Sequence, residues 1–402
     1  MRDREYPWPE VCLREIGEIS AGGTPSRDDP SLWNGAIPWL TPGDLTKNPQ
    51  TVTTESAEYI TRAGLNRSAA ALMPAGALLV TTRATLGART IAGVPMATNQ
   101  GFKNISFNSN LAESRFYFHL FRRLTSELVR RASGTTFLEI SGKEFGEITV
   151  PLPPLSEQRH IVEILDAVDM RIDLASAEHD KAKACAEALA QSLIPIDPNP
   201  QDLGDGWDLL ALSEVIPSVE YGISSPLELG MDGIPTLRMN NLEGGKMRLH
   251  EVKVSVEAVP PDLLLRDRDV LFNRTNSLEH VGRTSLWRSE IPVATFASYL
   301  VRLNPDHRRL CPEYLVRWLN RPAVQQRIRR FATPGVHQVN INPTSLRRTL
   351  IELPIDVRRQ QQIVAELDAI DAVVSSLQSE HRRLLEFKQG LMEDLLSGRV
   401  RV

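Results

Sequence analysis

One stretch of this chain occurs twice, and the repeat constrains the fold more strongly than any local motif. The stretch PLPPLSEQRHIVEILDAVDMRIDLASAEH begins at Pro151, and its second copy, LPIDVRRQQQIVAELDAIDAVVSSLQSEH, ends at His381, at a constant offset of 202 residues. The first-copy residues that recur are Gln158, Ile161, Val162, Leu165, Asp166, Ala167, Asp169, Glu178 and His179. A repeat of so long a period indicates that a whole structural unit is duplicated.

Both copies carry apolar residues in alternating steps of four and three, which is the heptad pattern of a helix packed along a narrow seam. The seam of the first copy contains Ile161, Leu165, Val168, Ile172, His179, Leu189 and Leu193. The seam of the second contains Ile363, Leu367, Ile370, Val374, Leu377, His381, Leu384, Leu391 and Leu395. We expect the two helices to pair with each other, and each to run for roughly 55–60 Å, a length that suits a spacer. The histidines at matched seam positions are interpreted as polar residues that fix the register, not as metal ligands.

Length and cysteine usage set the broad class. A chain of 402 residues predicts two or three domains. No apolar run is long enough to cross a membrane, and MRDREYPWPE lacks the apolar region of a secretory signal. Cys12, Cys185 and Cys311 are widely scattered, which predicts neither disulfides nor a zinc site and fits a reducing cytoplasm.

The net charge of −4 argues at first against a partner as acidic as DNA. Residues 156–200, however, hold 4 basic residues against 9 acidic ones, so most of the acidity lies on the first repeated helix. The segments 1–155 and 201–355 are close to neutral. Such modules bind DNA if their basic side chains cluster on one face.

The segments that precede the two helices follow one plan. GIPTLRMNNL echoes GAIPWLTPGDL, and RDRDVLFNRTN echoes AGALLVTTRAT, which places Arg274 opposite Arg83. CPEYLVRWLNRPAVQQRIRRFA likewise echoes the helical pattern of residues 114–132. Diverged modules on a duplicated scaffold indicate two readers of different targets at a fixed distance. Because B-DNA has dyad symmetry, a protein with an approximate two-fold axis can present one reader to each half of a split site.

The sequence resembles the specificity subunits of type I restriction–modification enzymes over essentially its whole length. The resemblance is carried by PLPPLSEQRHIV and its echo LPIDVRRQQQIV, by AGGTPS and IPWLTPGDL, by GTTFLEISGKEFGEITVPLP, and by the closing LLSGRVRV. The second copy departs from the pattern at its helix entry, where two prolines and the acidic residue are missing.

The resemblance implies an α+β fold, with two similar mixed α/β target-recognition domains in tandem, separated by two long helices that form an antiparallel coiled-coil-like spacer. The expected division is 1–155 for the first recognition domain, 156–200 for the central repeated helix, 201–355 for the second recognition domain and 356–402 for the distal repeated helix. Each domain is expected to read one half of an interrupted asymmetric sequence in double-stranded DNA. The helices are expected to set the gap and to dock two adenine methyltransferase subunits, which restriction/translocase subunits join.

Sequence motifs for chemistry are missing. No Walker A loop or GxGxxG follows a strand, no methyltransferase signature appears, and no metal-ligand spacing is present. We therefore expect no catalytic residue, no metal and no cofactor in this chain, with S-adenosylmethionine and ATP bound only by partner subunits.

Candidate DNA contacts lie in loops and at strand ends. They are Thr24, Ser26, Thr41, Asp44, Arg83, Thr135 and Thr136 in the first domain, and Asn240, Asn241, Arg274, Asn276, His337, Gln338 and Asn340 in the second. Arginine in a loop suits guanine or phosphate, and asparagine suits adenine. The structural alternatives are that the arginines solvate strand ends and that the asparagines stabilise turns.

Other functions stay open at this point. A specificity subunit for a fused methylase–nuclease system is one variant of the same reading. The alternative from a different class is a protein-binding helical scaffold with two duplicated interaction modules. Salt dependence separates the two classes, because DNA binding weakens steeply with added salt through counterion release.

Overall fold

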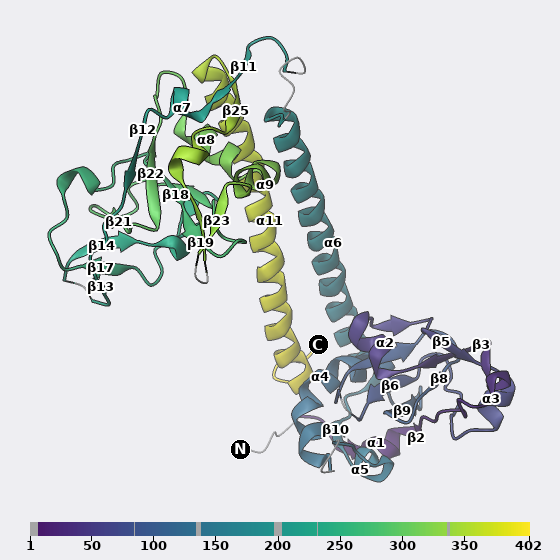
Figure 1. Cartoon of the computed structure of the whole chain (residues 1–402). Helices are drawn as coiled ribbons and strands as arrows, with labels where there is room; N and C mark the ends of the chain where they lie inside the picture. The colour runs from purple at the N-terminus through teal and green to yellow at the C-terminus, as the bar shows by residue number, and fades with distance from the viewer. Residues whose placement is uncertain (1–6, 84, 134–137, 197–202, 231, 336–337) are drawn as a thin grey trace. The chain divides into compact units, whose positions relative to one another are not determined.

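The computed structural model describes residues 7–83, 85–133, 138–196, 203–230, 232–335 and 338–402. The chain forms two compact units (Figure 1): unit 1 consists of Met1–Ser176 and Ser379–Val402, and unit 2 consists of Ala177–Gln378. Each unit contains a mixed α/β domain and a part of both long helices, α6 (Leu155–Leu193) and α11 (Val357–Ser397). In the described part of the chain, no helix combines the length and the apolar character that a membrane span needs.

Unit 1 is built on a five-stranded sheet and a three-stranded sheet. The first has the order β2 (Gly17–Ala21), β9 (Phe102–Phe107), β6 (Leu78–Thr81), β7 (Arg89–Ala92) and β4 (Val52–Thr53). The second has the order β5 (Glu58–Ile60), β3 (Trp33–Leu40) and β8 (Ala97–Thr98). A ribbon of β1 (Glu10–Cys12) and β10 (Thr149–Pro151) precedes α6. The helices are α1 (Leu13–Ile16), α2 (Pro42–Lys47), α3 (Arg62–Asn66), α4 (Ser114–Arg131) and α5 (Gly142–Gly146).

Unit 2 repeats this plan with more, shorter strands. One sheet has the order β12 (Ser218–Tyr221), β22 (Leu300–Asn304), β18 (Val270–Asn273) and β20 (Thr284–Leu286). Another has the order β13 (Leu227–Glu228), β17 (Lys253–Ser255), β14 (Ile234–Leu237) and β21 (Thr295–Phe296). The smaller sheets are β19 (Thr275–Asn276) with β24 (Val339–Ile341) and β23 (Ala332–Pro334), β11 (Trp207–Ala211) with β25 (Leu350–Pro354), and β15 (Leu242–Glu243) with β16 (Lys246–Met247). Its helices are α7 (Leu212–Val215), α8 (Pro312–Leu319), α9 (Pro322–Arg329) and α10 (Pro343–Leu346).

The domain helix differs between the units, and here the sequence-based expectation was wrong. Residues 311–332 were expected to form one helix like α4, but they form α8 and α9. Arg321 between them is extended, with φ −62° and ψ 134°, and Pro322 opens α9. A proline excludes helical backbone at the residue before it and lacks the N–H that an uninterrupted helix needs. α4 contains no proline and runs for 18 residues.

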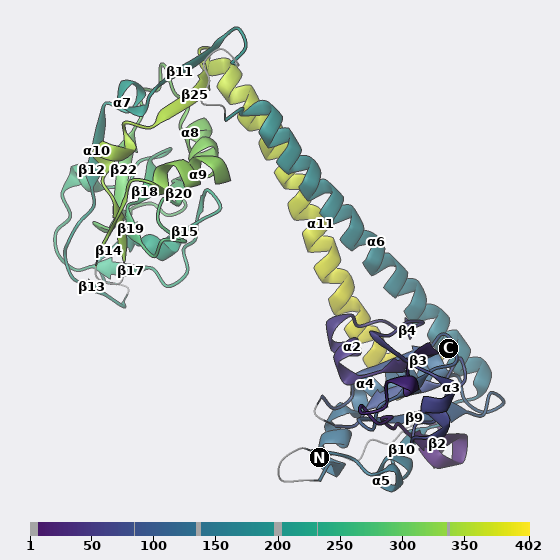
Figure 2. The ribbon, with the colours of Figure 1, turned by 45° about the vertical axis from the view of Figure 1, so that its right-hand side comes forward.

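The long helices pack along the predicted seam. Every seam residue named above is buried or half-buried, whereas Met170, Leu174 and Phe387, which lie off the seam, are 72%, 50% and 57% exposed. In unit 1, Asp169 pairs with Lys388 and Arg171 pairs with Glu380, so the partner number falls as the residue number rises (Figure 2). The two helices are therefore antiparallel. Gly398, with φ +72°, follows the last residue of α11 in the left-handed conformation that glycine favours.

A glutamine in each long helix anchors the domain of its unit. Gln158 is fully buried; its Oε1 accepts from Glu113 N at 2.8 Å, and its Nε2 donates to Leu111 O and Pro153 O, both at 2.8 Å. Gln360 makes the same set of bonds in unit 2. Its partners are Cys311 N at 2.8 Å, Arg309 O at 2.9 Å and Pro354 O at 2.8 Å. The recurring Gln of the sequence repeat thus ties the start of each long helix to the cap of the domain helix and to the end of the segment that leads into the long helix.

The core of each unit lies between its sheet and the long helices. In unit 1, α4 is in the middle: Phe116 and Leu120 join one buried cluster with Leu78 of β6 and Leu165 of α6. In unit 2, Tyr314 and Trp318 of α8 join Phe272 of β18 and Ile363 of α11 in the same way. The predicted fold class, with two similar mixed domains and an antiparallel helical pair, is confirmed.

Candidate nucleic-acid interface

The strand ladders match the two units residue by residue, and they correct the predicted register by one position. Leu78 pairs with Ile105 and Ile91 in unit 1, and Val270 pairs with Leu303 and Leu286 in unit 2. Leu78 therefore corresponds to Val270, and counting along the strands makes Thr82 the counterpart of Arg274.

Hydrogen bonds beyond the strands agree with this register. Thr82 N donates to Gly101 O at 2.8 Å, and Arg274 N donates to Tyr299 O at 3.0 Å. Ile140 N donates to Thr82 O at 3.1 Å, and Ile341 N donates to Arg274 O at 2.8 Å. The prediction that Arg83 lies opposite Arg274 was wrong: Arg83 corresponds to Thr275. Because successive side chains of a strand point to opposite faces, this single step places the two arginines differently.

Four of the candidates in unit 2 lie together at one small sheet. β19 pairs with β24 through Thr275–Asn340 and Asn276–Val339, and Gln338 directly precedes β24. Arg274 directly precedes β19. The same arrangement exists in unit 1 as single bridges, in which Glu139 pairs with both Arg83 and Ser133. The candidates Thr135, Thr136 and His337 lie outside the described residues.

Arg274 contacts two tyrosines that no local motif points to: its guanidinium lies over the ring of Tyr221, and its backbone N–H donates to Tyr299 O. Its guanidinium carbon is 5.1 Å from the ring centroid of Tyr221, and its Nη1 donates to Ser298 O in a long bond of 3.5 Å. Tyr221 and Tyr299 are 48% and 46% exposed. The tyrosines follow from no local motif, because only the paired strands bring β12, β18 and β22 side by side.

Arg83 has acidic surroundings instead. Its Nε lies 3.9 Å from Glu139 Oε2, and the buried Lys103 has its Nζ 3.7 Å from Glu139 Oε1. Glu139 occupies the position that Asn340 holds in unit 2. Arg83 thus belongs to a network of two cations and a carboxylate, whereas among the described candidates Arg274, Asn276, Gln338 and Asn340 of unit 2 only Arg274 is charged.

Two of the predicted base contacts are helix caps. Asp44 accepts from Thr41 N at 2.7 Å, from Thr41 Oγ1 at 2.6 Å and from Ala57 N at 3.2 Å. Asn241 is fully buried; it accepts from Arg238 N at 2.9 Å and donates to Arg248 O and His250 O at 2.7 and 3.1 Å. Thr41, Asp44 and Asn241 thus make hydrogen bonds inside their own domains, and their contact with bases stays a prediction. Asn240, next to Asn241 in the chain, is exposed and stays a candidate.

Thr24 and Ser26 follow a close approach of two backbones. A Cβ at Gly22 would overlap the carbonyl oxygen of Asn99, and a Cβ at the matched Gly222 would overlap that of Phe296. Only glycine fits both positions. Thr24 Oγ1 donates to Gln100 Oε1, and Ser26 O accepts from Trp33 Nε1 at 2.9 Å. Both residues are exposed and stay candidates.

A group with metal-ligand chemistry lies in unit 1, where α4 meets α6. His119, Asp166 and Asp169 each offer a ligand atom, all within 4.8 Å of one another, beside a cavity of about 630 Å³. Burial, together with the charges of Lys388, Arg89, Arg115 and Arg122, lowers the pKa of His119 to about 3. Lys388 already pairs with Asp169, and Arg115 pairs with Asp166 at 2.6 Å. With four cations in range, the carboxylates are already neutralised, and we assign no metal here.

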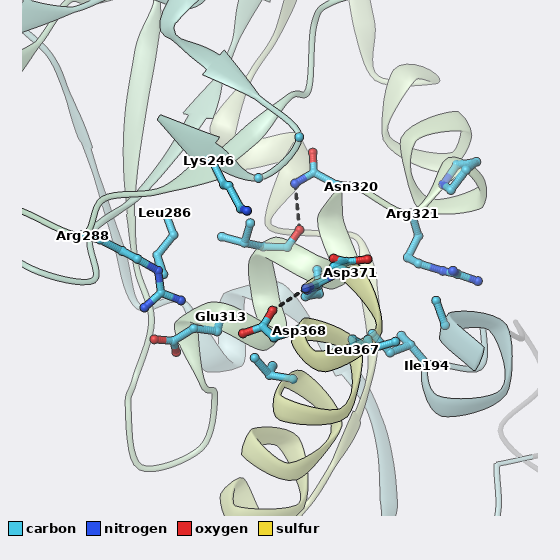
Figure 3. A pocket seen from close by; sticks show the side chains of 17 residues that line it. Ile194, Lys246, Leu286, Arg288, Glu313, Asn320, Arg321, Leu367, Asp368 and Asp371 are labelled. Atoms are coloured by element: carbon cyan, nitrogen blue, oxygen red, sulfur yellow. Dashed lines mark hydrogen bonds and ion pairs between the residues drawn. The ribbon is translucent and has the colours of Figure 1, made fainter. Parts of the chain in front are cut away.

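In unit 2, a single basic side chain pairs with both of the corresponding carboxylates. Asp368 and Asp371, the second copies of Asp166 and Asp169, both pair with Arg317 of α8, the latter at 2.6 Å. They form one wall of a cavity of about 300 Å³, with Ile194, which follows α6, and Leu367 of α11 also on its wall (Figure 3). The helix caps make Cys311 the counterpart of Glu113, so Arg317 corresponds to His119. These repeated acids attach each domain to its long helix and are not a catalytic pair.

Comparisons with known proteins agree with this duplicated recognition architecture. The family model described as "Type I restriction modification DNA specificity domain" matches residues 5–184. The chain is 29% identical over 307 residues to the type I restriction enzyme MjaIX specificity subunit of Methanocaldococcus jannaschii, covering 72% of this chain and 69% of that protein. It is 30% identical over 175 residues to the EcoR124I/EcoR124II specificity subunit of Escherichia coli, covering 42% of each.

Solved structures show the same fold. A chain from a study of complex assembly and conformational transition of the type I R-M system superposes with a TM-score of 0.64 at 20% identity, covering 98% of this chain and all of that one. The HsdS subunit of Thermoanaerobacter tengcongensis superposes with a TM-score of 0.54 at 19% identity, covering 98% and 97%.

The chain holds two mixed α/β domains with the same backbone frame and an antiparallel pair of long helices. Matched strand ends of the two domains carry different side chains. These features are typical of a protein with two recognition domains in tandem. The chain resembles the specificity subunits of type I restriction–modification enzymes, in its sequence through the family model over residues 5–184 and in its fold over nearly its whole length. The matched family model is described as a DNA specificity domain, which agrees with recognition of DNA sequence.

Proposed function

We propose that each unit presents one reading surface to DNA and that the two surfaces read the two halves of an interrupted asymmetric site. In unit 2 the surface is formed by Arg274, Asn276, Gln338 and Asn340. Asn240, which follows β14 in the sequence, is also included. In unit 1 it is formed by Arg83 and its neighbours, with Thr24 and Ser26. The recognition domains are taken as residues 1–155 and 201–355, and the repeated helices as 156–200 and 356–402.

One observation carries the proposal: the two units hold equivalent backbone positions but display different chemistry there. At the bridge to the small sheet, Glu139 of unit 1 stands where unit 2 has Asn340. Base edges in the major groove are told apart by hydrogen-bond donors and acceptors at fixed places. Two domains that read different half-sites therefore require equivalent backbone positions that carry different hydrogen-bond donors and acceptors.

The helical pair supports the second part of the proposal, which is that α6 and α11 set the gap and dock partners. Apolar side chains off the seam are exposed on both helices: Met170, Leu174, Val373, Leu385 and Phe387. Exposed apolar surface of this kind marks a protein–protein contact. The partners are two adenine methyltransferase subunits, joined by restriction/translocase subunits. S-adenosylmethionine and ATP are bound by those subunits, and the complex acts in the cytoplasm, where cellular DNA is found.

A methylation map tests the proposal. The chain is expressed with its cognate methyltransferase in a host without modification, and the DNA is sequenced for methyladenine. We expect a split asymmetric motif with a constant gap, and exchange of residues 201–355 for those of a relative should change one half only. A continuous motif would contradict the two-reader arrangement.

The map also decides the alternative of a protein-binding scaffold, which the names of the relatives do not favour. If the complex with the methyltransferase assembles and no DNA is methylated, the scaffold reading replaces ours. Binding of the complex to its motif should also weaken steeply between 50 and 200 mM salt, roughly 10³-fold or more, because phosphate contacts release counterions.

A further inference from the structure

Arg274, Tyr221 and Tyr299 form a group at the reading surface of unit 2 that has no counterpart in unit 1. Tyr221 is matched by Ala21, since Gly222 and Gly22 follow them with the same backbone contacts. Arg274 is matched by Thr82, and Tyr299 by Gly101. Three small residues of unit 1 are thus replaced by an arginine and two aromatic rings on an unchanged backbone.

The guanidinium of Arg274 has spare donors. A guanidinium offers five N–H donors, and in the described part of the chain only Nη1 has a side-chain hydrogen bond, the long one to Ser298 O. Its Nε is buried without a partner. Among the described residues, no carboxylate lies within ion-pair distance of Arg274, in contrast to Arg268, Arg302, Arg317 and Arg327 of the same unit. Arg274 is half-buried, so its orientation is limited by the protein while donors remain for a ligand.

The neighbouring rings restrict this side chain. Tyr221 lies under the guanidinium, and stacking of a planar cation on an aromatic face holds its plane as well as its position. Both tyrosines remain nearly half exposed although they are large and partly apolar. An aromatic pair left open to solvent beside an unpaired guanidinium is typical of a contact surface.

We propose that Arg274, oriented by Tyr221, reads a guanine in the half-site that unit 2 recognises, through bidentate hydrogen bonds to O6 and N7. This rests on the proposed function, since it assumes that this surface faces DNA. The planar fork of arginine matches the two acceptors of guanine in the major groove, and such a pair is the commonest specific contact. A phosphate could accept the same planar fork, but a phosphate contact carries no sequence information, so only a guanine contact would make the methylated motif depend on Arg274.

Unit 1 cannot read a base in this way at the same place. Thr82 is buried, and its hydroxyl donates to Gly101 O at 3.4 Å. The nearest arginine in sequence, Arg83, is one residue further along and lies beside Glu139. The requirement for guanine at this position therefore belongs to the second half of the motif only, and the first half is an internal control in the same molecule.

The experiment compares methylation maps of the complete complex carrying Arg274→Lys or Arg274→Ala with the wild-type map. Lysine keeps the charge but loses the bidentate fork. We expect both variants to accept other bases at one guanine position in the half-motif assigned to residues 201–355, with discrimination falling roughly 10- to 100-fold. Tyr221→Ala should loosen the same position, and Tyr221→Phe should not. Arg348→Lys, at an exposed arginine of the same unit, is the matched control.

Each other outcome overturns the proposal. An unchanged motif with Arg274→Lys shows that charge suffices, and weaker methylation at all sites without a change of motif identifies a phosphate contact. Loss of all methylation by Arg274→Lys in an assembled complex makes the residue structural. Failure of the proposed function is seen separately, because the wild-type map would then lack a split motif before any variant is made.

Discussion

Gln158 of unit 1 and Gln360 of unit 2 make the same three hydrogen bonds, whereas Thr82 and Arg274, which are also matched, share only their backbone bonds. The difference follows from burial. A buried amide with three backbone partners has no substitute that leaves all of them satisfied. A side chain at an open strand end is under no such constraint. The duplicated chain therefore keeps one interior and displays two surfaces.

On the side of each domain that faces the long helices, the two units share one feature and differ in another. Both units neutralise the repeated acid pair of the long helix, but unit 2 does so with Arg317 of its own domain helix. Unit 1 has His119 at that position and takes its cations from Arg115 and from Lys388 of α11. The requirement for neutralisation is shared, while the source of the charge is not.

The largest expected effect tests the shared interior. Gln158→Ala and Gln360→Ala each leave three backbone groups without partners, and at about 1 kcal/mol or more for each group we expect losses of roughly 3 kcal/mol or more. Thermal and urea unfolding of the full chain measures this. Because the bonds match, the two losses should be similar.

The control for the glutamines is Gln361→Ala, which changes an exposed neighbour of Gln360 on the same helix. It should leave the unfolding midpoint nearly unchanged. A large loss for one glutamine and none for the other would contradict the claim that the two anchors are equivalent.

Alanine at the two close-approach glycines tests the frame itself. Gly22→Ala and Gly222→Ala place a methyl group against a backbone carbonyl that cannot swing away. Overpacking of this kind costs about 1–3 kcal/mol or more, and thermal unfolding of the full chain checks it. Gly142→Ala and Gly204→Ala, where an added Cβ meets nothing within 4 Å, are the controls. If Gly22→Ala were harmless while Gly222→Ala was not, the first strands of the two units would not be equivalent.

Much of this frame could be predicted from the sequence. The seven-residue period and the recurring Gln158 indicated two paired helices, and the alternating apolar runs indicated the strands. Apolar periodicity reports burial, and burial is what builds both elements. Pro322 separates α8 from α9, and because proline disfavours a continuous helix, the sequence contains the signal for this break as well.

The surface could not be predicted to the residue. Between β6 and β9 the offset of the two units changes from 192 to 198 residues, because the connecting loops differ in length. A direct sequence alignment of residues 75–85 with 266–276 does not reveal this change in offset. A register error of one residue assigns a side chain to the wrong face of the strand. Asp44 and Asn241 show why residue type alone does not identify a base contact, because the residue types that pair with bases also cap helices, as these two do.

Replacing Lys388 and Arg317 by glutamine tests whether the two units depend equally on these cations to neutralise their repeated carboxylates. Lys388→Gln should cost roughly 1–2 kcal/mol, because Lys388 and Asp169 are only 17% and 28% exposed. Arg317→Gln should cost less than about 1 kcal/mol, because Asp368 and Asp371 are about half exposed and their pairs are screened. Urea unfolding at low and high salt measures both. Salt should reduce the cost of Arg317→Gln more, and the opposite ranking would show that unit 1 does not depend on α11 for its charge.

The smallest effect at neutral pH is expected at His119, which only unit 1 has. The side chain is 2% exposed, its Nε2 has no hydrogen-bond partner, and burial and then the nearby cations Lys388, Arg89, Arg115 and Arg122 lower its pKa to about 3. Asp166 faces it at 3.8 Å and has a raised pKa, mainly through burial. Since an unfolded histidine takes up a proton below a pH of about 6.5 and the folded one does not until about 3, stability must fall as the pH falls between these values.

His119→Gln keeps a donor of similar reach but removes the titration. Near pH 7 the unfolding midpoint should hardly move, because both side chains are neutral there, whereas between pH 6.5 and 4 the variant should lose stability less steeply than the wild type. Urea midpoints across this range give the slope, and His160→Gln, at an exposed histidine of α6, controls for the loss of any histidine. Equal slopes for wild type and His119→Gln would mean that His119 is protonated in the folded state. Its charge would then take part in neutralising Asp166, as Arg317 does for Asp368, and the contrast between the two units at this position would disappear.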